Sequence, residues 1–194
     1  DHNEAYLLKS EQIPGETFED GEKIKVYVVE VANSERGPKV MISRTHPGLV
    51  KRLFEIEVPE VYEGTVEIKA VSREAGSRTK LAVWSRDPDV DAVGACIGAR
   101  GARVAKIVDE LGGEKIDVVQ YSEDPVEFIS AALSPARVVS VEVDPDGARA
   151  CKVKVPDEQL SLAIGNRGQN ARLAARLTGW KIDIKPESGF FGEE

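Results

Sequence analysis

The sequence predicts an α+β protein in which one mixed unit of helices and strands occurs twice, after a short all-β segment. Three observations support this prediction. Residues 95–101 and 162–168 share an apolar start followed by Ile-Gly-x-Arg-Gly, about 67 residues apart. The same order of expected elements surrounds both copies. Ahead of them, Ile24, Val26 and Val28 alternate with charged and polar neighbours, as in a half-buried strand.

Residues 1–45 are expected to form part of a β-barrel. Val40 and Ile42 repeat the alternation of the first strand, after a turn at residues 34–38. Turn-forming residues occupy much of residues 11–22, ahead of both strands. Because so few short strands make a marginal domain alone, we expect the chain to begin inside a domain.

The first mixed unit is expected over residues 46–121. A helix follows Pro47, a residue that favours the first helical turn, and its apolar face is formed by Leu49, Val50, Leu53 and Phe54. The remaining elements are expected as strands at 65–72 and 79–85, a short helix at 90–97, the loop 98–101, a helix at 102–111 and a strand at 115–121.

The second unit is expected over residues 122–186. Asp124 precedes Pro125 at a helix start, and that helix ends before Pro135. The same order then follows, as strands at 138–143 and 151–155, a short helix at 157–164, the loop 165–168, a helix at 169–178 and a strand at 180–185. Residues 187–194 are expected to form a turn-rich tail.

The composition narrows the possible classes of protein. No apolar run of the 194 residues is long enough to cross a bilayer. The two cysteines are too few for a disulfide framework and have no metal-ligand spacing. We therefore expect a cytoplasmic protein without membrane contact, metal or cofactor. The net charge of −8 argues against a general affinity for polyanions, so the local distribution of charge has to decide.

Each repeat places a Gly-x-x-Gly loop directly before a helix. Glycine has no Cβ, so a ligand backbone can approach closely. The unpaired N–H groups and the positive dipole end of the helix favour a phosphate. Arg100 and Arg167 occupy the third loop position, and residues 97–107 and 164–177 contain no acid. Two basic segments on an acidic chain predict a defined site for a polyanion.

These features resemble the K-homology (KH) family, in which Ile-Gly-x-x-Gly connects two helices and the loop clamps about four nucleotides of single-stranded RNA. A helix and two strands before the loop, with one strand after it, resemble the prokaryotic order α-β-β-α-α-β. That order implies a three-stranded sheet with helices packed on one face. One Gly-x-x-Gly is weak evidence, since a helix terminator explains it as well. Two copies, each with Ile and Arg, favour RNA binding.

Over nearly its whole length the chain also resembles the RNA-binding section of the NusA family of bacterial transcription elongation factors. The matching segments are residues 11–16, 93–98, 113–117, 159–170, 173–175 and 177–180. The resemblance implies that residues 1–45 are the latter part of an OB-fold barrel of the ribosomal protein S-one type, and that two KH domains follow. It implies binding of nascent single-stranded RNA during elongation, termination and antitermination, without catalysis. In full-length members it implies contact with RNA polymerase and other elongation factors. We expect a monomer.

The family's binding surface, carried over residue by residue, implies a site in each unit. The first comprises Ile97, Gly98, Ala99, Arg100, Gly101, Arg103 and Lys106. The second comprises Ile164, Gly165, Asn166, Arg167, Gly168, Gln169, Asn170, Arg172 and Arg176. Glycines and the following amides are expected to hold phosphates, arginines to pair with phosphate or stack on bases, and Asn170 to reach a base edge. Ile97 and Ile164 are expected either to support bases or to lie in the core. Aspartate at Gly98 and Gly165 is expected to abolish binding and spare thermal stability.

Two other interpretations stay open. An accessory region of a phosphorolytic exoribonuclease also joins KH and OB modules, but with a single KH unit that precedes the barrel. A protein-interaction scaffold would carry degenerate loops. The remaining chemical residues are expected to be structural: His2 and His46 are isolated, Cys96 and Cys151 lie in apolar segments, and Asp87, Asp89 and Asp91 precede a helix that they can cap.

Overall fold

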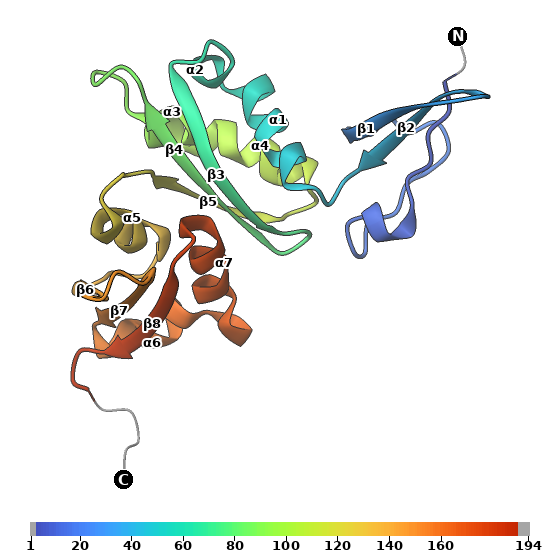
Figure 1. Ribbon diagram of the computed structural model, residues 1–194. Coiled ribbons are helices and arrows are strands. Elements are labelled where there is room, and N and C mark those ends of the chain that lie inside the picture. Colours follow the sequence, from blue (N-terminus) through green and yellow to red (C-terminus); the bar gives the residue numbers. More distant parts are fainter. Residues whose placement is uncertain (1–2, 190–194) are drawn as a thin grey trace.

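The computed structural model describes residues 3–189 and contains three separate sheets (Figure 1). A two-stranded hairpin lies at one end of the molecule, and two three-stranded sheets with their helices form the rest. The predicted α+β class, with a repeated mixed unit after a β segment, is confirmed. Part of the expected tail, residues 190–194, lies outside the described residues, as does His2.

The N-terminal segment contains a 3-10 turn (Lys9–Glu11) and the strands β1 (Tyr27–Ser34) and β2 (Gly37–Ser43). The expected strand around Val28 begins only at Tyr27, so Ile24 and Val26 precede it. The prediction that this strand is half-buried is wrong, because Val28 and Val31 are largely exposed on a hairpin that no second layer covers among the described residues.

The N-terminal segment is nevertheless fastened to the first mixed unit. Ile13 is buried in the core of that unit. The buried Arg44 donates to both carboxylate oxygens of Glu16, at 2.6 and 2.8 Å, and to the carbonyl oxygen of Glu110 at 3.0 Å. The Glu16 pair holds the Arg44 side chain in place within the N-terminal segment, and the contacts of Arg44 with Glu110 join that segment to the first unit.

The elements within residues 46–121, called the first module below, follow the predicted order except for one additional short helix, α2 (Pro59–Tyr62). In chain order they are α1 (Pro47–Glu57), α2, β3 (Val66–Glu74), β4 (Arg78–Ser85), α3 (Ala92–Ile97), a 3-10 turn (Ala99–Gly101), α4 (Ala102–Glu110) and β5 (Lys115–Gln120). The apolar face predicted for α1 is buried as expected. His46 caps α1, since its Nδ1 accepts from the N–H of Gly48 at 2.8 Å, and Asp91 caps α3 through the N–H of Gly94.

The second module, residues 122–186, repeats the first. Its elements are α5 (Pro125–Ala132), β6 (Ser140–Val143), β7 (Ala150–Val155), a 3-10 turn (Asp157–Gln159), α6 (Leu160–Ile164), a second 3-10 turn (Asn166–Gly168), α7 (Gln169–Thr178) and β8 (Lys181–Pro186). Asp124 caps α5 by accepting from the N–H of Val126 at 3.0 Å, as predicted.

Both three-stranded sheets have the same topology. The first two strands of each pair antiparallel, and the middle strand pairs parallel with the last, in the orders β3-β4-β5 and β6-β7-β8. Each module's own helices bury one face of its sheet. Leu81 and Val83 point into the helices of the first module, and Val153 and Val155 into those of the second. The predicted KH-type arrangement is confirmed.

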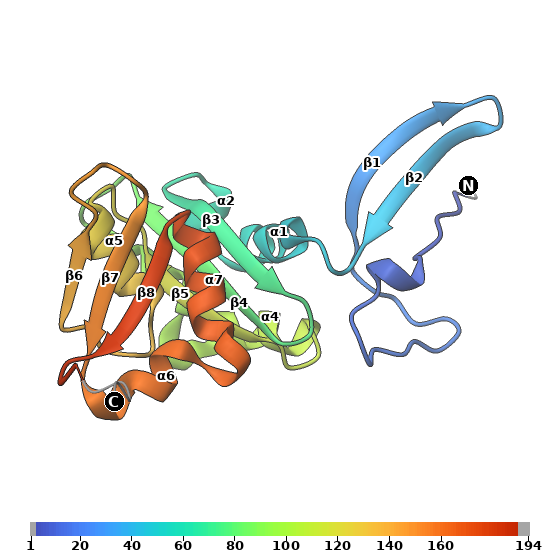
Figure 2. The same ribbon diagram turned by 60° about the horizontal axis from the view of Figure 1, so that its bottom comes forward.

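The opposite face of the first sheet is covered by the second module. Helix α7 lies along β3 and β4 (Figure 2). Ala82 and Val119 are buried there, in one apolar cluster with Ile129, Leu133 and Ala174 of the second module. The two modules therefore share a continuous core across their junction.

One buried cation strengthens this junction. The Nζ of Lys80 donates to Asp117 Oδ2 at 3.0 Å and to the carbonyl oxygen of Ser134, in the second module, at 2.7 Å. Burial lowers the pKa of Lys80, while the neighbouring Asp117 carboxylate acts in the opposite direction. A buried ammonium with two acceptors in fixed places favours one relative orientation of the modules.

Candidate nucleic-acid interface

The two Gly-x-x-Gly loops have nearly the same backbone. Gly98 and Gly165 have φ/ψ of 78/170° and 80/170°. Arg100 and Arg167, at 54/30° and 53/31°, are the only described residues other than glycine with positive φ. Left-handed backbone at a side-chain-bearing residue costs free energy and is found where a site requires it. Its occurrence at both loops indicates a shared geometric requirement.

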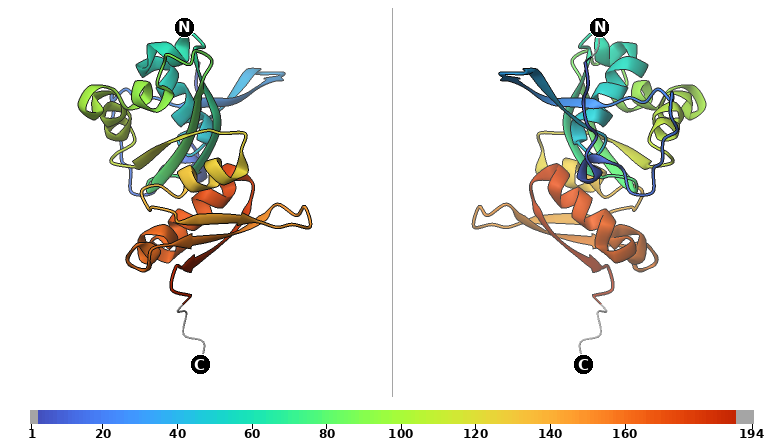
Figure 3. Two further views of the ribbon diagram at one scale, coloured as in Figure 1. Left: turned by 90° about the vertical axis from the view of Figure 1, so that its left-hand side faces the viewer. Right: turned by 90° about the vertical axis from the view of Figure 1, so that its right-hand side faces the viewer.

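Both loops face the same side of the molecule. In the left-hand view of Figure 3, the α3–α4 connection and the α6–α7 connection both lie at the left, one above the other. The loop residues Ala99, Arg100, Asn166 and Arg167 are exposed. Each loop leads directly into a helix, so the positive end of the helix dipole lies at the loop and favours an anion. The first N–H group of each helix, at Ala102 and Gln169, already donates to the loop carbonyl oxygens of Ala99 and Asn166.

The predicted basic residues fall into two groups. Arg100, Arg167 and Arg176 are exposed, and within the described residues no acidic group lies within 4.0 Å of their side-chain nitrogens. The others are already paired, as Arg103 with Glu60 at 2.9 Å, Lys106 with Glu57 at 3.1 Å and Arg172 with Glu74 at 2.6 Å. The free group fits phosphate pairing, whereas each residue of the second group would first have to exchange its partner.

Arg103 and Asn170 occupy the same position in the two modules, five residues after the first loop glycine, and both hold the loop together. Arg103 Nη1 donates to the carbonyl oxygen of Ala95 at 2.8 Å. Asn170 Nδ2 donates to the carbonyl oxygens of Ala163 and Leu133 at 2.9 and 3.1 Å. Asn170 is 1% exposed. The expectation that it reaches a base edge does not fit this geometry, because its side chain lies inside the fold.

Ile97 and Ile164 are half-buried at the ends of α3 and α6, beside the loops. Ile164 packs against the core of the second module. Gln169 is also half-buried, and its amide donates to the hydroxyl of Ser77 in the first module at 2.7 Å. Glu74 and Ser77 therefore border the second loop, although nothing in their local sequence indicates it, since they precede that loop by about 90 residues.

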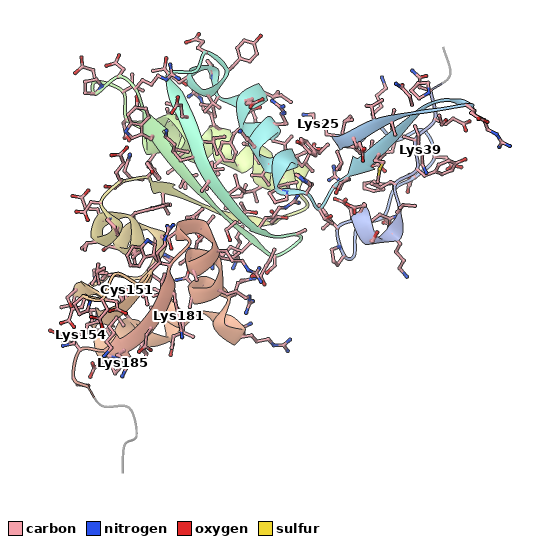
Figure 4. All side chains as sticks on the ribbon, viewed as in Figure 1. Lys25, Lys39, Cys151, Lys154, Lys181 and Lys185 are labelled. Atoms are coloured by element: carbon pink, nitrogen blue, oxygen red, sulfur yellow. The ribbon has the colours of Figure 1, made fainter. Side chains whose placement is uncertain are left out.

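The structure adds a set of lysines that the sequence argument did not assign. Lys154, Lys181 and Lys185 are exposed on β7 and β8, on the sheet of the second module (Figure 4). Side chains alternate along β7, and Val153 and Val155 are buried against the helices of the second module. Lys154 therefore lies on the opposite face of the sheet. These residues are separated from the second loop by the sheet and lie outside the candidate interface.

Both cysteines are buried, and their thiols are held in the protonated form. Burial raises the pKa of the Cys96 thiol to about 12, and burial also raises that of Cys151. Among residues 3–189, no three His, Cys, Asp or Glu side chains gather as metal ligands. In the same range no helix combines the length and hydrophobicity that crossing a membrane requires.

Comparison with known proteins identifies relatives of both modules. The family described as NusA-like first KH domain matches residues 44–121, and the NusA-like second KH domain matches residues 125–190. Proteins named transcription termination/antitermination protein NusA are 60% identical in Halalkalibacterium halodurans, 60% in Bacillus subtilis and 53% in Thermus thermophilus. The matches cover 95%, 95% and 94% of this chain, but 48%, 50% and 47% of the relatives. The chain thus spans about half the length of the curated relatives it matches.

Proposed function

The chain belongs to the NusA family, and on that premise we propose that residues 46–121 and 122–186 are two KH domains that bind single-stranded RNA together. The observation that carries the proposal is the repetition of one loop backbone, on one side of the molecule, with an exposed arginine in the same left-handed conformation each time. A loop of this type holds about four nucleotides, so two loops suit an extended strand.

The roles of the individual residues follow from their exposure and partners. The loop glycines would let phosphates approach the positive ends of the two helices, and Arg100 and Arg167 would pair with phosphate or stack on bases. Ile97 and Ile164 would support the bases with their exposed parts. Arg176, farther along α7, would add long-range attraction for the strand, and Lys106 would add to it once it exchanged its partner Glu57 for a phosphate.

The relatives are named for termination and antitermination of transcription, and we propose the same wider role for this protein. It would act by contact with the nascent transcript in the bacterial cytoplasm. RNA polymerase and other elongation factors would be contacted by the longer protein. The chain would act as a monomer and as a binding module without catalysis. None of the three relatives compared carries the name of an exoribonuclease, which disfavours that alternative.

An anisotropy titration of a labelled, unstructured oligoribonucleotide tests the proposal. Gly101→Asp with Gly168→Asp puts a carboxylate into each loop at a position with room for it, and we expect binding to fall at least tenfold. The matched control is Gly64→Asp with Gly147→Asp, which changes two other open, positive-φ glycines away from the loops. Equal losses in both double variants would contradict a loop-centred site.

The dependence of affinity on salt separates RNA binding from a scaffold role. Each phosphate contact to a single strand contributes a slope of about −0.7 in a plot of log affinity against log salt. We expect a steep negative slope for the wild-type chain and a shallower one for the loop variant. A protein-interaction scaffold would show no RNA affinity at any salt concentration.

A further inference from the structure

The start of α7, directly after the second loop, is bonded to the first module rather than left free. Gln169 Nε2 donates to Ser77 Oγ at 2.7 Å. Arg172 Nη2 and Nε donate to the two carboxylate oxygens of Glu74 at 2.6 and 3.3 Å. Glu74 ends β3, and Ser77 lies in the turn that connects β3 to β4. One turn of the first module therefore holds the helix that follows the loop of the second.

The same guanidinium also reaches into the loop. Arg172 Nη1 donates to the carbonyl oxygen of Arg167 at 3.0 Å. Arg167 is the loop residue with left-handed backbone, at φ 53°. A planar guanidinium presents its donors in a fixed fork. Anchoring one edge on Glu74 therefore fixes the direction of the donor that holds the Arg167 carbonyl.

The first loop is held from within its own module, by Arg103, which pairs with Glu60 and donates to the carbonyl oxygen of Ala95. Counting from the last loop glycine, Gln169 corresponds to Ala102 and Arg172 corresponds to Ala105. Alanine side chains donate no hydrogen bond, so neither position can pin the first loop to a neighbour. The two loops share a backbone but differ in what maintains it.

We infer that Arg172 is a positioning residue of the second loop, through which Glu74 of the first module keeps that loop in its binding shape. This inference rests on the proposed function. It assigns Arg172 to shaping the site, in contrast to the phosphate contact expected from its sequence. It also makes RNA binding by the second module depend on contact with the first.

The two possible roles of Glu74 predict effects of opposite sign. If Glu74 only competes with phosphate for Arg172, removing its charge frees a cation and strengthens RNA binding. If Glu74 positions Arg172, removing its charge loosens the loop and weakens binding. Glu74→Gln keeps the size of the side chain and removes only the charge, so the sign of its effect distinguishes the two.

The experiment measures RNA affinity in two backgrounds. With the first loop disabled by Gly101→Asp, we expect Glu74→Gln to weaken binding about two- to fivefold, the range of a partly exposed ion pair. With the second loop disabled by Gly168→Asp, the same change is expected to have no effect. A change that only lowered overall stability would act in both backgrounds alike.

The matched control is Glu67→Gln, also on β3, which breaks the pairs with Arg86 at 2.6 Å and with Lys69 at 2.8 Å without touching α7. It is expected to leave the affinity unchanged. An unchanged or increased affinity of Glu74→Gln in the first background, or an equal loss in both, would overturn the inference. If wild type bound no RNA, or the two loop variants bound as well as wild type, the proposed function itself would fail, which is a distinguishable result.

Discussion

At the scale of single residues, the two glycines of each loop differ in the space around them. A Cβ on Gly98 would lie 2.7 Å from Arg103 Cγ and 2.9 Å from its backbone nitrogen, and one on Gly165 would lie 2.6 Å from the backbone nitrogen of Asn170. A Cβ on Gly101 would have its nearest neighbour, Val104 Cγ1, at 4.0 Å. The first glycine is required by packing, while the second faces open space that a ligand can enter.

Alanine substitutions are expected to separate these two requirements. Gly98→Ala introduces a clash with backbone and puts a side chain at φ 78°, ψ 170°, a region almost restricted to glycine, so it should cost about 3 kcal/mol. Gly101→Ala, in the left-handed helical region, should cost about 1 kcal/mol. Urea unfolding of the two variants measures the difference, and equal costs would contradict the packing argument.

This crowding overturns one prediction from the sequence and limits others. Aspartate at Gly98 and Gly165 cannot spare thermal stability, because both sites lack room for a side chain. The pairing of the charged residues was also not predictable from the sequence near each loop. The absence of acids near each loop in the sequence suggested free cations, but Arg103 and Arg172 pair with acids 43 and 98 positions away. Local composition does not reveal partners that only the fold brings close.

At the scale of elements, the β3–β4 turn connects all three parts of the chain. Gly76 in this turn lies against Ile13 and Pro14 of the N-terminal segment. Ser77 contacts the second module through Gln169. The turn was predictable from its glycine, as were most helices and strands from their periodicity. Its contacts were not, because they join residues far apart in sequence.

A buried carboxylate supports this turn, and its loss should be costly. Glu114 is fully buried and accepts from Arg73, from the N–H of Gly76 at 2.7 Å and from the hydroxyl of Thr79 at 2.7 Å. Glu114→Gln would leave the equally buried Arg73 side chain without its counter-ion, which costs about 3 kcal/mol or more.

Urea unfolding again provides the measurement for Glu114. The control is Glu60→Gln, which removes the partner of Arg103 from a pair that is about one third exposed on both sides. That change should cost about 1 kcal/mol or less. Similar losses in the two variants would mean that the buried network does not hold the turn.

At the scale of the whole molecule, the two modules share a fold but differ in whether the sheet face opposite their own helices is covered. In the parallel strand pairs, Ala82 lies opposite Val119 in the first module, and Lys154 lies opposite Lys185 at the corresponding positions of the second. The first pair is buried beneath the second module, whereas the second pair is exposed. The repeated order of elements and the resemblance to KH domains predicted both sheets. The sequence did not show which of the two sheets would be covered. Only the fold brings α7 against the face that carries Ala82 and Val119.

Ala82 and Lys154 occupy corresponding positions in the two modules, and exchanging their residue types tests how the modules are held together. Ala82→Lys places a charge without a partner in the shared apolar cluster, and desolvating it costs several kcal/mol. We expect the second module to undock. The radius of gyration from small-angle scattering should then increase, and calorimetric unfolding should separate into two transitions.

Lys154→Ala, the reverse change at the exposed counterpart, should alter neither. A compact Ala82→Lys variant with a single transition would mean that the fixed orientation of the two loops does not come from the apolar cluster around Ala82, and that the buried Lys80 bridge or the Glu74–Arg172 pair maintains it instead.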